Sequence, residues 1–555
     1  MSVSAETPSA ASASPPPARK PSGLLRNSLI NSGFTLLSRF AGLARDLVLS
    51  AYLGASGNIM ADAYYTAQAF PNLFRRIFAE GAFSAAFVPS YSAALERDGK
   101  DAADKMAHDA MATLVFITVA FCFVCQFTMP WLMYVIKPGF ASDPAKFKLA
   151  VLFTQITMPY LPCMAIVAHL SGVLNARGRF LISAGVPILL NAVTLALVIP
   201  QHTQYDSALW GSIGTTVAGV LQAMLLLWGA KKSGAHVSLS IIPVFTKDIN
   251  KLLLLAVPGA LAAAATQVNV FISQNFSSSI PGATSWLAIA DRFYQLPLGM
   301  VGVAIGTALL PALSRAVHAE DHEHAQKTMD QAITLSMALS IPAAVALMAM
   351  PFFLADGLYT RGATTVFDTH QIARCLFHYG WGVPAFVLTR ILNPAFFARK
   401  DTFGPMKFAV VSVIVNLTVG LTMFHQIGAA GLAIGTSSAA WVNVALMVFT
   451  LDKRKTWTIG PQALKGLCLV LIAAFGMAAF CLYCTWVRPQ IEGAILSIIP
   501  SLGGNALLVA IFRHAKEIGV LGVCFAGLFL YIGLLFVTGA VKPRELKAVL
   551  KRRPK

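Results

Sequence analysis

The chain has 555 residues, of which 56% are hydrophobic and only 12% are charged. Soluble globular proteins carry roughly a quarter of their residues as Asp, Glu, Lys and Arg, so this composition excludes an ordinary soluble enzyme. The net charge of +18 is scattered between apolar runs, which argues against a nucleic-acid-binding face. The mean hydropathy of +0.67 is typical of a polytopic membrane protein.

Taken in chain order, residues 1–22 are rich in Ser, Ala and Pro, and we predict a disordered cytoplasmic tail there. The rest is predicted to be all-α, with about 14 transmembrane helices. These spans lie near residues 27–53, 62–93, 109–135, 150–174, 182–200, 207–229, 250–277, 284–314, 328–355, 369–396, 406–424, 428–450, 466–486 and 517–539. The stretch 491–512 is broken by Pro500, which favours an interfacial segment over an extra span.

The positions of the basic residues predict the orientation, because Lys and Arg collect in short cytoplasmic loops. With the N-terminus inside, 28 of the 42 basic residues fall in inside segments and 7 fall within spans. Another 7 fall outside, among them Lys137, Lys146 and Lys148. Both termini are therefore predicted to be cytoplasmic, with a basic tail at 542–555.

Two short motifs repeat along the chain. The motif at 176–180 resembles the motif at 398–403, with Arg177 and Arg399 separated by 222 residues. This spacing makes the fourth predicted span equivalent to the tenth. Because a shift of six helices is even, the two repeats should have the same orientation in the membrane. We therefore predict two pseudo-symmetric six-helix lobes, at 23–232 and 247–452, and two further helices within 465–541.

Charged side chains inside the predicted spans suggest a ligand. The arginines among them are Arg39, Arg45, Arg75, Arg76, Arg292, Arg374 and Arg390, and the acids are Asp46, Asp62, Glu80 and Asp291. An arginine at a helix centre costs about 2.5–3.5 kcal/mol on insertion scales, so these side chains need an interior or watery location. Seven arginines against four acids leave three positive charges uncompensated. Because guanidinium groups bind phosphate oxygens bidentately, we predict a phosphate or diphosphate head group as the guest.

A second interpretation is that individual arginines extend to lipid head groups or pair with the acids, which fits Arg374 and Arg390 better than the others. In the first span, Arg39, Gly42 and Asp46 share one helical face, and Gly42 leaves room for a close approach.

The sequence offers no enzyme motif. It contains no Walker A loop, no HExxH and no GxSxG, so we predict no ATP hydrolysis, no cofactor and no metal site. The histidines and acids at 318–324 mimic metal-ligand spacing, but a solvated helix start is the simpler interpretation. The charged residues at 98–101, the best candidates for a membrane-embedded enzyme, are better interpreted as a solvated turn.

Several motifs resemble the MurJ/MviN family of lipid II flippases, and the resemblance runs from about Leu24 to Val541. These motifs are Ser38–Asp46, Asp62–Tyr64, Pro71–Phe83, Ala290–Arg292, Gly302–Thr307 and Leu310–Pro311. The resemblance implies a multi-pass protein of the bacterial inner membrane, in the multidrug/oligosaccharidyl-lipid/polysaccharide exporter superfamily. It implies two lobes around a cationic cavity and a groove for the lipid tail between the last two helices. Its cargo would be lipid II, moved from the inner to the outer leaflet, and its partners would be membrane lipids and the cell-wall synthesis or division machinery.

The resemblance also implies roles for single residues. Those implied to bind the diphosphate are Arg39, Arg45, Arg75 and Arg292. The acids implied to accompany them are Asp46, Asp62 and Glu80. Together with these acids, Gly42, Arg76, Asp291 and Arg390, which the sequence pattern itself singles out, are predicted to support the cavity or its gating. The chain departs from several relatives at Gln295 and Arg390, where these have an acid and a lysine, so both differences keep or raise the positive balance.

We therefore expect a transporter, namely a lipid II flippase that works by alternating access and is driven by membrane potential or an ion gradient. One alternative is a multidrug or cation antiporter, whose cavity should be acidic. The other is a flippase for a different polyprenyl-diphosphate-linked glycan.

Overall fold

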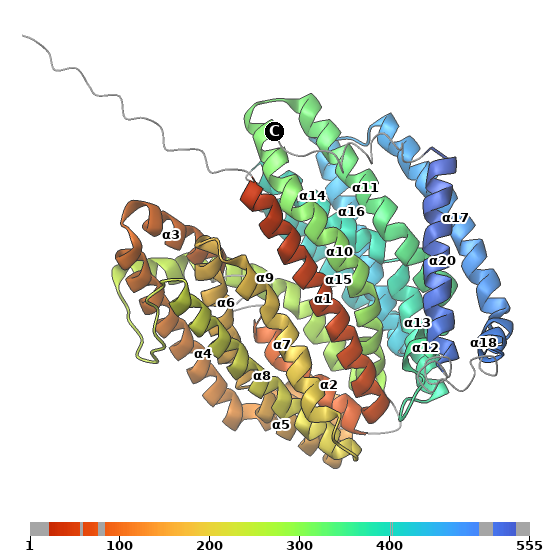
Figure 1. Ribbon diagram of the computed structural model, residues 1–555, viewed down its shortest axis with the longest axis horizontal. Coiled ribbons are helices and arrows are strands. Elements are labelled where there is room, and N and C mark those ends of the chain that lie inside the picture. The colour runs from red at the N-terminus through yellow and green to blue at the C-terminus, as the bar shows by residue number, and fades with distance from the viewer. Residues whose placement is uncertain are drawn as a thin grey trace, which may run out of the picture.

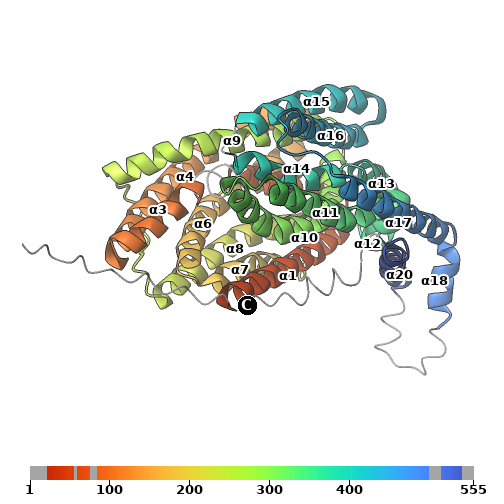
Figure 2. The same cartoon turned by 90° about the horizontal axis from the view of Figure 1, so that it is seen from above.

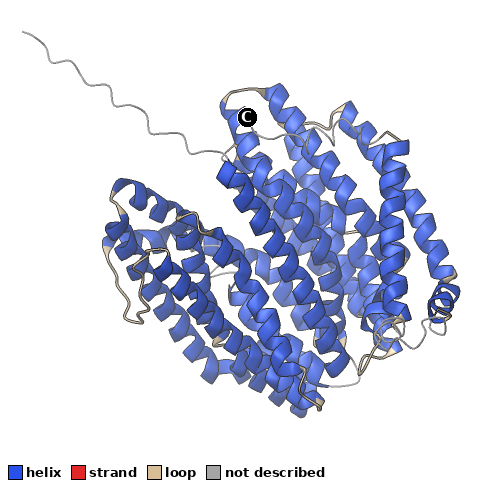
Figure 3. Ribbon diagram, in the orientation of Figure 1, coloured by secondary structure: helices blue, strands red, loops and turns tan. Residues whose placement is uncertain are grey.

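The computed structural model describes residues 22–55, 59–75, 84–399, 401, 403–498 and 514–539. The predicted site residues Arg76 and Glu80, most of the N-terminal tail, the basic C-terminal tail and most of the 491–512 stretch lie outside the described residues. The described part is helical and contains no strand, which confirms the predicted all-α class (Figure 3).

Two halves and a C-terminal group make up the described chain. The first half contains α1 (Ser22–Leu53), α2 (Ile59–Arg75), α3 (Ser84–Arg97), α4 (Lys100–Ile136), the 3-10 turn η2 (Pro138–Ser142), α5 (Pro144–Thr157), α6 (Tyr160–Ala176), α7 (Phe180–Val198) and α8 (Gln204–Lys232). The second half contains α9 (Lys247–Ser277), α10 (Ala283–His318), α11 (His322–Ala349), α12 (Pro351–Tyr359), α13 (Val366–Gly380), α14 (Val383–Phe397), α15 (Phe403–Ile427) and α16 (Ala429–Lys453). The C-terminal group contains α17 (Pro461–Trp486), α18 (Arg488–Leu496) and α20 (Ala515–Val537).

Nine helical segments among the described residues are long and apolar enough to cross a membrane. Neither α1 nor α10 is among these nine, although both carry arginines that the sequence singles out. The total of about 14 spans stays a prediction.

Some stretches predicted as single spans are pairs of helices. Residues 328–355 form α11 and α12, which meet at Met350. Proline disfavours the helical conformation of the residue before it, and Met350, which precedes Pro351, has a φ of −136°. Residues 369–396 are likewise divided into α13 and α14 on either side of Trp381.

The halves lie side by side around α1. In Figure 1, most of the first half lies on one side of the molecule and α10–α16 lie on the other, with α1 running along the junction. Seen from above, the C-terminal helices form the edge farthest from α3 and α4 (Figure 2). Asp356 of α12 helps to hold this edge in place, because it pairs with Arg488 of α18 and Lys516 of α20.

The two arginines of the sequence repeat make similar contacts. Arg177 donates a hydrogen bond to the carbonyl of Ser233, just after α8 ends. Arg399 donates to the carbonyl of Thr456, just after α16 ends. Each arginine therefore contacts the chain just beyond the last helix of its own half, so the two contacts occupy equivalent places in the halves.

Candidate functional site

A cavity of about 880 Å³ lies between the halves, lined chiefly by α1, α2, α6, α7 and α8 of the first half and α9 and α10 of the second. All four arginines predicted to bind an anion line it, namely Arg39, Arg45, Arg75 and Arg292. The carboxylates among its described lining residues are Asp46 and Asp291. Four guanidinium groups against two carboxylates give this lining a net charge of +2, which favours an anionic guest.

Helix α1 contributes a polar face to the cavity. Arg39, Gly42 and Asp46 are spaced by three and four residues, so a helix presents them on the same side, and all three line the cavity. The side chain of Asn191 on α7 approaches Gly42 and donates a hydrogen bond to the carbonyl of Ser38. Helix α7 therefore supports the polar face of α1, and Asn191 is itself part of the cavity lining.

One carboxylate joins two of the arginines across the halves. Asp46 is buried, and its Oδ1 accepts hydrogen bonds from Nε and Nη2 of Arg45 at 3.0 and 2.8 Å. Its Oδ2 lies 2.7 Å from Nε of Arg292, on α10. Because two guanidinium groups share this single carboxylate, the group of three keeps a net positive charge.

Arg39 lacks such a partner. Its Nη1 donates to the carbonyl of Gln295 at 3.0 Å, and no carboxylate of the described residues lies within 4.0 Å of its guanidinium group. The guanidinium lies against Gly299 of α10, where a Cβ atom would overlap it. The absence of a side chain at Gly299 therefore leaves the space that Arg39 occupies.

Substituting Gly299 with alanine tests this contact. The added methyl group meets the flexible end of Arg39 rather than backbone, so Gly299→Ala should fold normally but displace the guanidinium. We expect transport to fall at least about tenfold, since a charge-assisted hydrogen bond contributes about 1.5–3 kcal/mol. The measurement is transport by Gly299→Ala at matched expression, with Gly522→Ala as the control, because a Cβ atom at Gly522 meets nothing within 4 Å. Normal transport by Gly299→Ala would show that the position of Arg39 is unimportant.

Arg75 reaches the cavity from the last residue of α2. Its Nε donates to Oδ1 of Asn72 at 3.1 Å. Pro71 lacks an N–H group, so the carbonyl of Ala67 loses its helical donor and instead accepts a hydrogen bond from Thr157 of α5 at 2.8 Å. The end of α2 that carries Arg75 is therefore fixed on α5.

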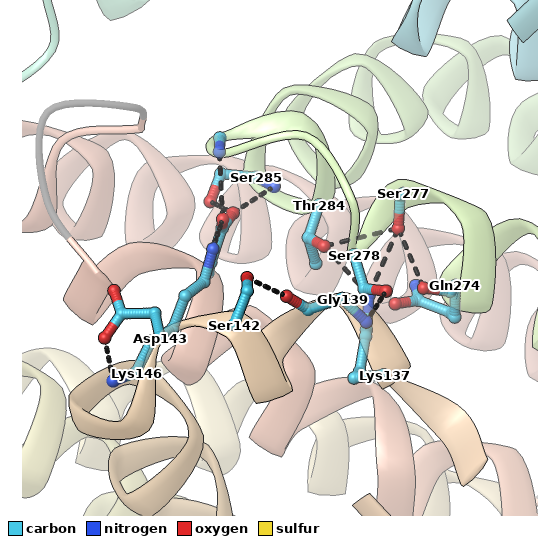
Figure 4. Close-up of polar contacts among 12 residues, drawn as sticks. Lys137, Gly139, Ser142, Asp143, Lys146, Gln274, Ser277, Ser278, Thr284 and Ser285 are labelled. Carbon is cyan, nitrogen blue, oxygen red and sulfur yellow. Dashed lines mark hydrogen bonds and ion pairs between the residues drawn. The ribbon is translucent and has the colours of Figure 1, made fainter. Parts of the chain in front are cut away.

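Polar contacts join the halves at the end of the bundle where α1 ends and α2 begins, which we call the closed end. Lys137 Nζ donates to the hydroxyl oxygens of Ser277 and Thr284 at 3.1 and 2.8 Å (Figure 4). The backbone N–H of Gly139 donates to Oγ of Ser278 at 3.0 Å. Ser277 and Thr284 also line the cavity, so these contacts form its wall at this end.

Asp62 of α2 caps a helix of the other half. Helix α10 begins after Gly282, which has no side chain to cap it. The buried Asp62 carboxylate accepts hydrogen bonds from the backbone N–H groups of Gly282 and Ser285 at 2.9 and 3.2 Å, and from the Ser285 hydroxyl at 2.8 Å. Lys146 Nζ of α5 lies 2.5 Å from the same carboxylate. The closed end thus contains a buried ion pair whose acid also satisfies the start of α10.

Of the remaining charged residues that the sequence singled out and the structure describes, one lines the cavity and the others lie outside its lining. Asp291 lines the cavity and accepts a hydrogen bond from Gln295. Arg390 on α14 is exposed and is not part of the lining, and Arg374 on α13 is exposed beside Gln371. Asp62 lies at the closed end rather than on the cavity surface.

Sequence reasoning missed two groups of polar residues. One is the pair of lysines at the closed end, Lys137 and Lys146, which the sequence places in an outer loop but which are buried. The other is a set of cavity-lining amides, namely Gln68, Asn72, Asn175, Asn191, Gln222, Gln267 and Gln274. Single amides within apolar spans were the only signal for the second group.

Comparisons with known proteins agree with this architecture. The family model for the lipid II flippase MurJ matches residues 49–501. A probable lipid II flippase MurJ of Rhizobium tropici is 35% identical over 538 residues, covering 96% of this chain and 97% of that protein. A solved lipid II flippase MurJ in an inward closed conformation has a TM-score of 0.71 at 23% identity, covering 93% of this chain and 99% of its own.

The fold is shared more widely. An inward-facing multidrug resistance transporter of the MATE family, in the MOP superfamily, has a TM-score of 0.61 at 13% identity, covering 77% of this chain and 99% of its own. This likeness concerns the fold alone, whereas the family model covers most of the sequence. The resemblance noted in the sequence is therefore confirmed, and the chain belongs to the lipid II flippase MurJ family.

Proposed function

We propose that this protein moves lipid II across the bacterial inner membrane and binds the diphosphate of its head group in the cavity. The observation that carries the proposal is that Arg39, Arg45, Arg75 and Arg292, from three helices of two halves, line one cavity. Family membership supports lipid II as the cargo. The diphosphate supplies the negative charge that this lining favours.

The arrangement around Asp46 supports a binding step. A diphosphate can accept hydrogen bonds from several guanidinium groups at once, and these bonds replace the water that the anion loses on entering. Arg39, whose hydrogen bond goes to a neutral carbonyl, is free of competition from any described carboxylate within 4.0 Å. Arg45 and Arg292 share Asp46, so each keeps donors that Asp46 does not use.

We propose an alternating-access cycle in which the halves part at the closed end. With both termini cytoplasmic, the closed end faces the outer side of the membrane. Parting requires Lys137, Gly139 and Asp62 to release their partners in the second half. An inside-negative potential favours outward movement of an anion by about 2.3 kcal/mol per charge per 100 mV, so it can drive the cycle without ATP.

The lipid tail is proposed to stay in the membrane beside the cavity, along a groove formed by the helices of residues 465–541. Large apolar side chains on α17 and α20 are exposed, among them Phe475, Trp486, Phe525 and Phe529. Such residues suit contact with lipid chains. Contacts with the cell-wall synthesis or division machinery are part of the same proposal.

Reconstitution tests the function directly. Purified protein in liposomes should move fluorescent lipid II to the opposite leaflet, and it should not exchange a cationic drug for protons. The control is a polyprenyl monophosphate without sugar, which separates diphosphate recognition from general lipid scrambling. Drug exchange without lipid II movement would support the multidrug antiporter, and preference for another diphosphate-linked glycan would change the cargo.

A further inference from the structure

Lys137 at the closed end is a buried amine between the two halves. It follows α4 directly and precedes η2, and its side chain is fully buried. Its hydrogen-bond partners, Ser277 and Thr284, belong to the second half (Figure 4). Any movement that separates the halves at this end therefore breaks both hydrogen bonds and brings Lys137 into water.

Lys137 has no carboxylate partner of its own among the described residues. The nearby acid on α2 is Asp62, whose carboxylate already pairs with Lys146 of α5 and accepts hydrogen bonds from the start of α10. Asp143, the other nearby acid of the first half, caps α5 through the backbone of Ala145 and Lys146. Among the described residues of α9 and α10, the hydrogen-bond acceptors for Nζ are the hydroxyl oxygens of Ser277 and Thr284. No carboxylate of the described chain lies within 4.0 Å of Nζ, so the charged form is poorly compensated.

The neutral amine fits the closed geometry. An uncharged –NH2 group has two N–H donors, and two hydroxyl oxygens accept from Nζ. Burial lowers the pKa of Lys137 to about 7, while nearby Asp62 raises it and Lys146 lowers it. In water the pKa of a lysine is near 10.5. The amine therefore binds a proton more tightly when the two halves are apart at this end than when they are in contact.

We propose that Lys137 is a proton-binding latch: the two halves meet at the closed end around the neutral amine, and their separation there takes up one proton from the adjoining compartment. That this compartment is the outer one rests on the proposed function. The pH dependence of opening does not, since it follows from the contacts of Lys137 and involves no lipid substrate.

The direction of the effect follows from linkage. The open arrangement binds the extra proton, so closure is favoured as the pH rises above about 7 and is lost as the pH falls toward that value. Between about pH 9 and pH 7 the ratio of open to closed molecules should rise by up to about tenfold per pH unit. Below about pH 7 the amine is protonated in both arrangements, and this dependence should level off.

Spin labels on the two halves measure this ratio. Ser142 and Ser279 are exposed residues of the first and second half near the closed end, so cysteines there can be labelled in a background without the native cysteines. Electron–electron distance measurements should show a longer-distance population that grows from about pH 9 to pH 7 and then levels off. Lys137→Met should remove the slope, and Lys148→Met, at an exposed lysine of α5, should keep it.

A second variant covers the case in which Lys137→Met does not fold. An arginine stays charged, so Lys137→Arg should favour the open arrangement at every pH. A flat profile in the unmodified protein, or the same slope in Lys137→Met, would overturn the latch. Neither result bears on lipid II transport, which the arginine variants test separately.

Discussion

Arg39→Ala is expected to lower lipid II transport by roughly tenfold to a hundredfold, because a hydrogen bond to a charged group contributes about 1.5–3 kcal/mol. The described contacts of Arg39 include no carboxylate, so its charge is available to the diphosphate. Arg39→Lys should retain part of the transport, since it keeps the charge but loses the planar fork. The measurement is the amount of lipid II in the outer leaflet of cells that depend on the variant.

Arg374→Ala is the matched control, because Arg374 lies outside the cavity lining and contacts Gln371 of its own helix. It should leave transport unchanged at equal expression. The result that counts against diphosphate binding is normal transport by both Arg39→Ala and Arg292→Ala in membranes that contain normal amounts of each protein.

Asp62→Ala is expected to open the closed end. Removing this carboxylate leaves Lys146 buried without its partner, and breaking a buried ion pair costs about 3–5 kcal/mol. It also leaves the N–H groups of Gly282 and Ser285 without their acceptor. The variant should populate molecules whose halves are apart at this end, measured as greater labelling of a Thr284→Cys side chain by a water-soluble thiol reagent.

Asp206→Ala provides the comparison, since Asp206 is a half-buried acid at the start of α8 whose carboxylate, among the described residues, accepts a hydrogen bond from Thr203 of its own segment. With Asp206→Ala, the Thr284→Cys side chain should be labelled as much as in the protein that carries Thr284→Cys alone. Equal labelling of Asp62→Ala and Asp206→Ala in folded protein would mean that Asp62 does not hold the halves together.

The sequence predicted the helical class and the arginines of the cavity for a physical reason. Charged side chains in apolar helices are costly, so they stand out, and the three- and seven-residue spacing of Arg39, Gly42 and Asp46 fixes a common face. The same reasoning included Arg390, which is exposed on α14 and is not part of the described lining, so its role in the cavity or its gating stays a prediction. Spacing along one helix does not show which neighbour that helix faces.

The closed end could not be predicted in the same way. Lys137 and Lys146 occur between apolar segments, where lysines are normally solvated, and their burial depends on residues about 140 and 84 positions away, respectively. Asp62 was selected as an acid inside a span, but its role as a cap for α10 depends on Gly282, 220 residues later. Contacts of this kind follow from the docking of two halves and leave no local pattern.

Native mass spectrometry of the purified protein tests the central claim most directly, because it identifies the lipid that stays bound. The unsubstituted protein should carry a polyprenyl-diphosphate-linked species with the mass of lipid II, and the Arg39→Ala/Arg292→Ala double variant should lose it while keeping ordinary phospholipids. Equal retention of that species by both proteins, or its absence from the unsubstituted protein, would contradict a cavity built to bind a diphosphate.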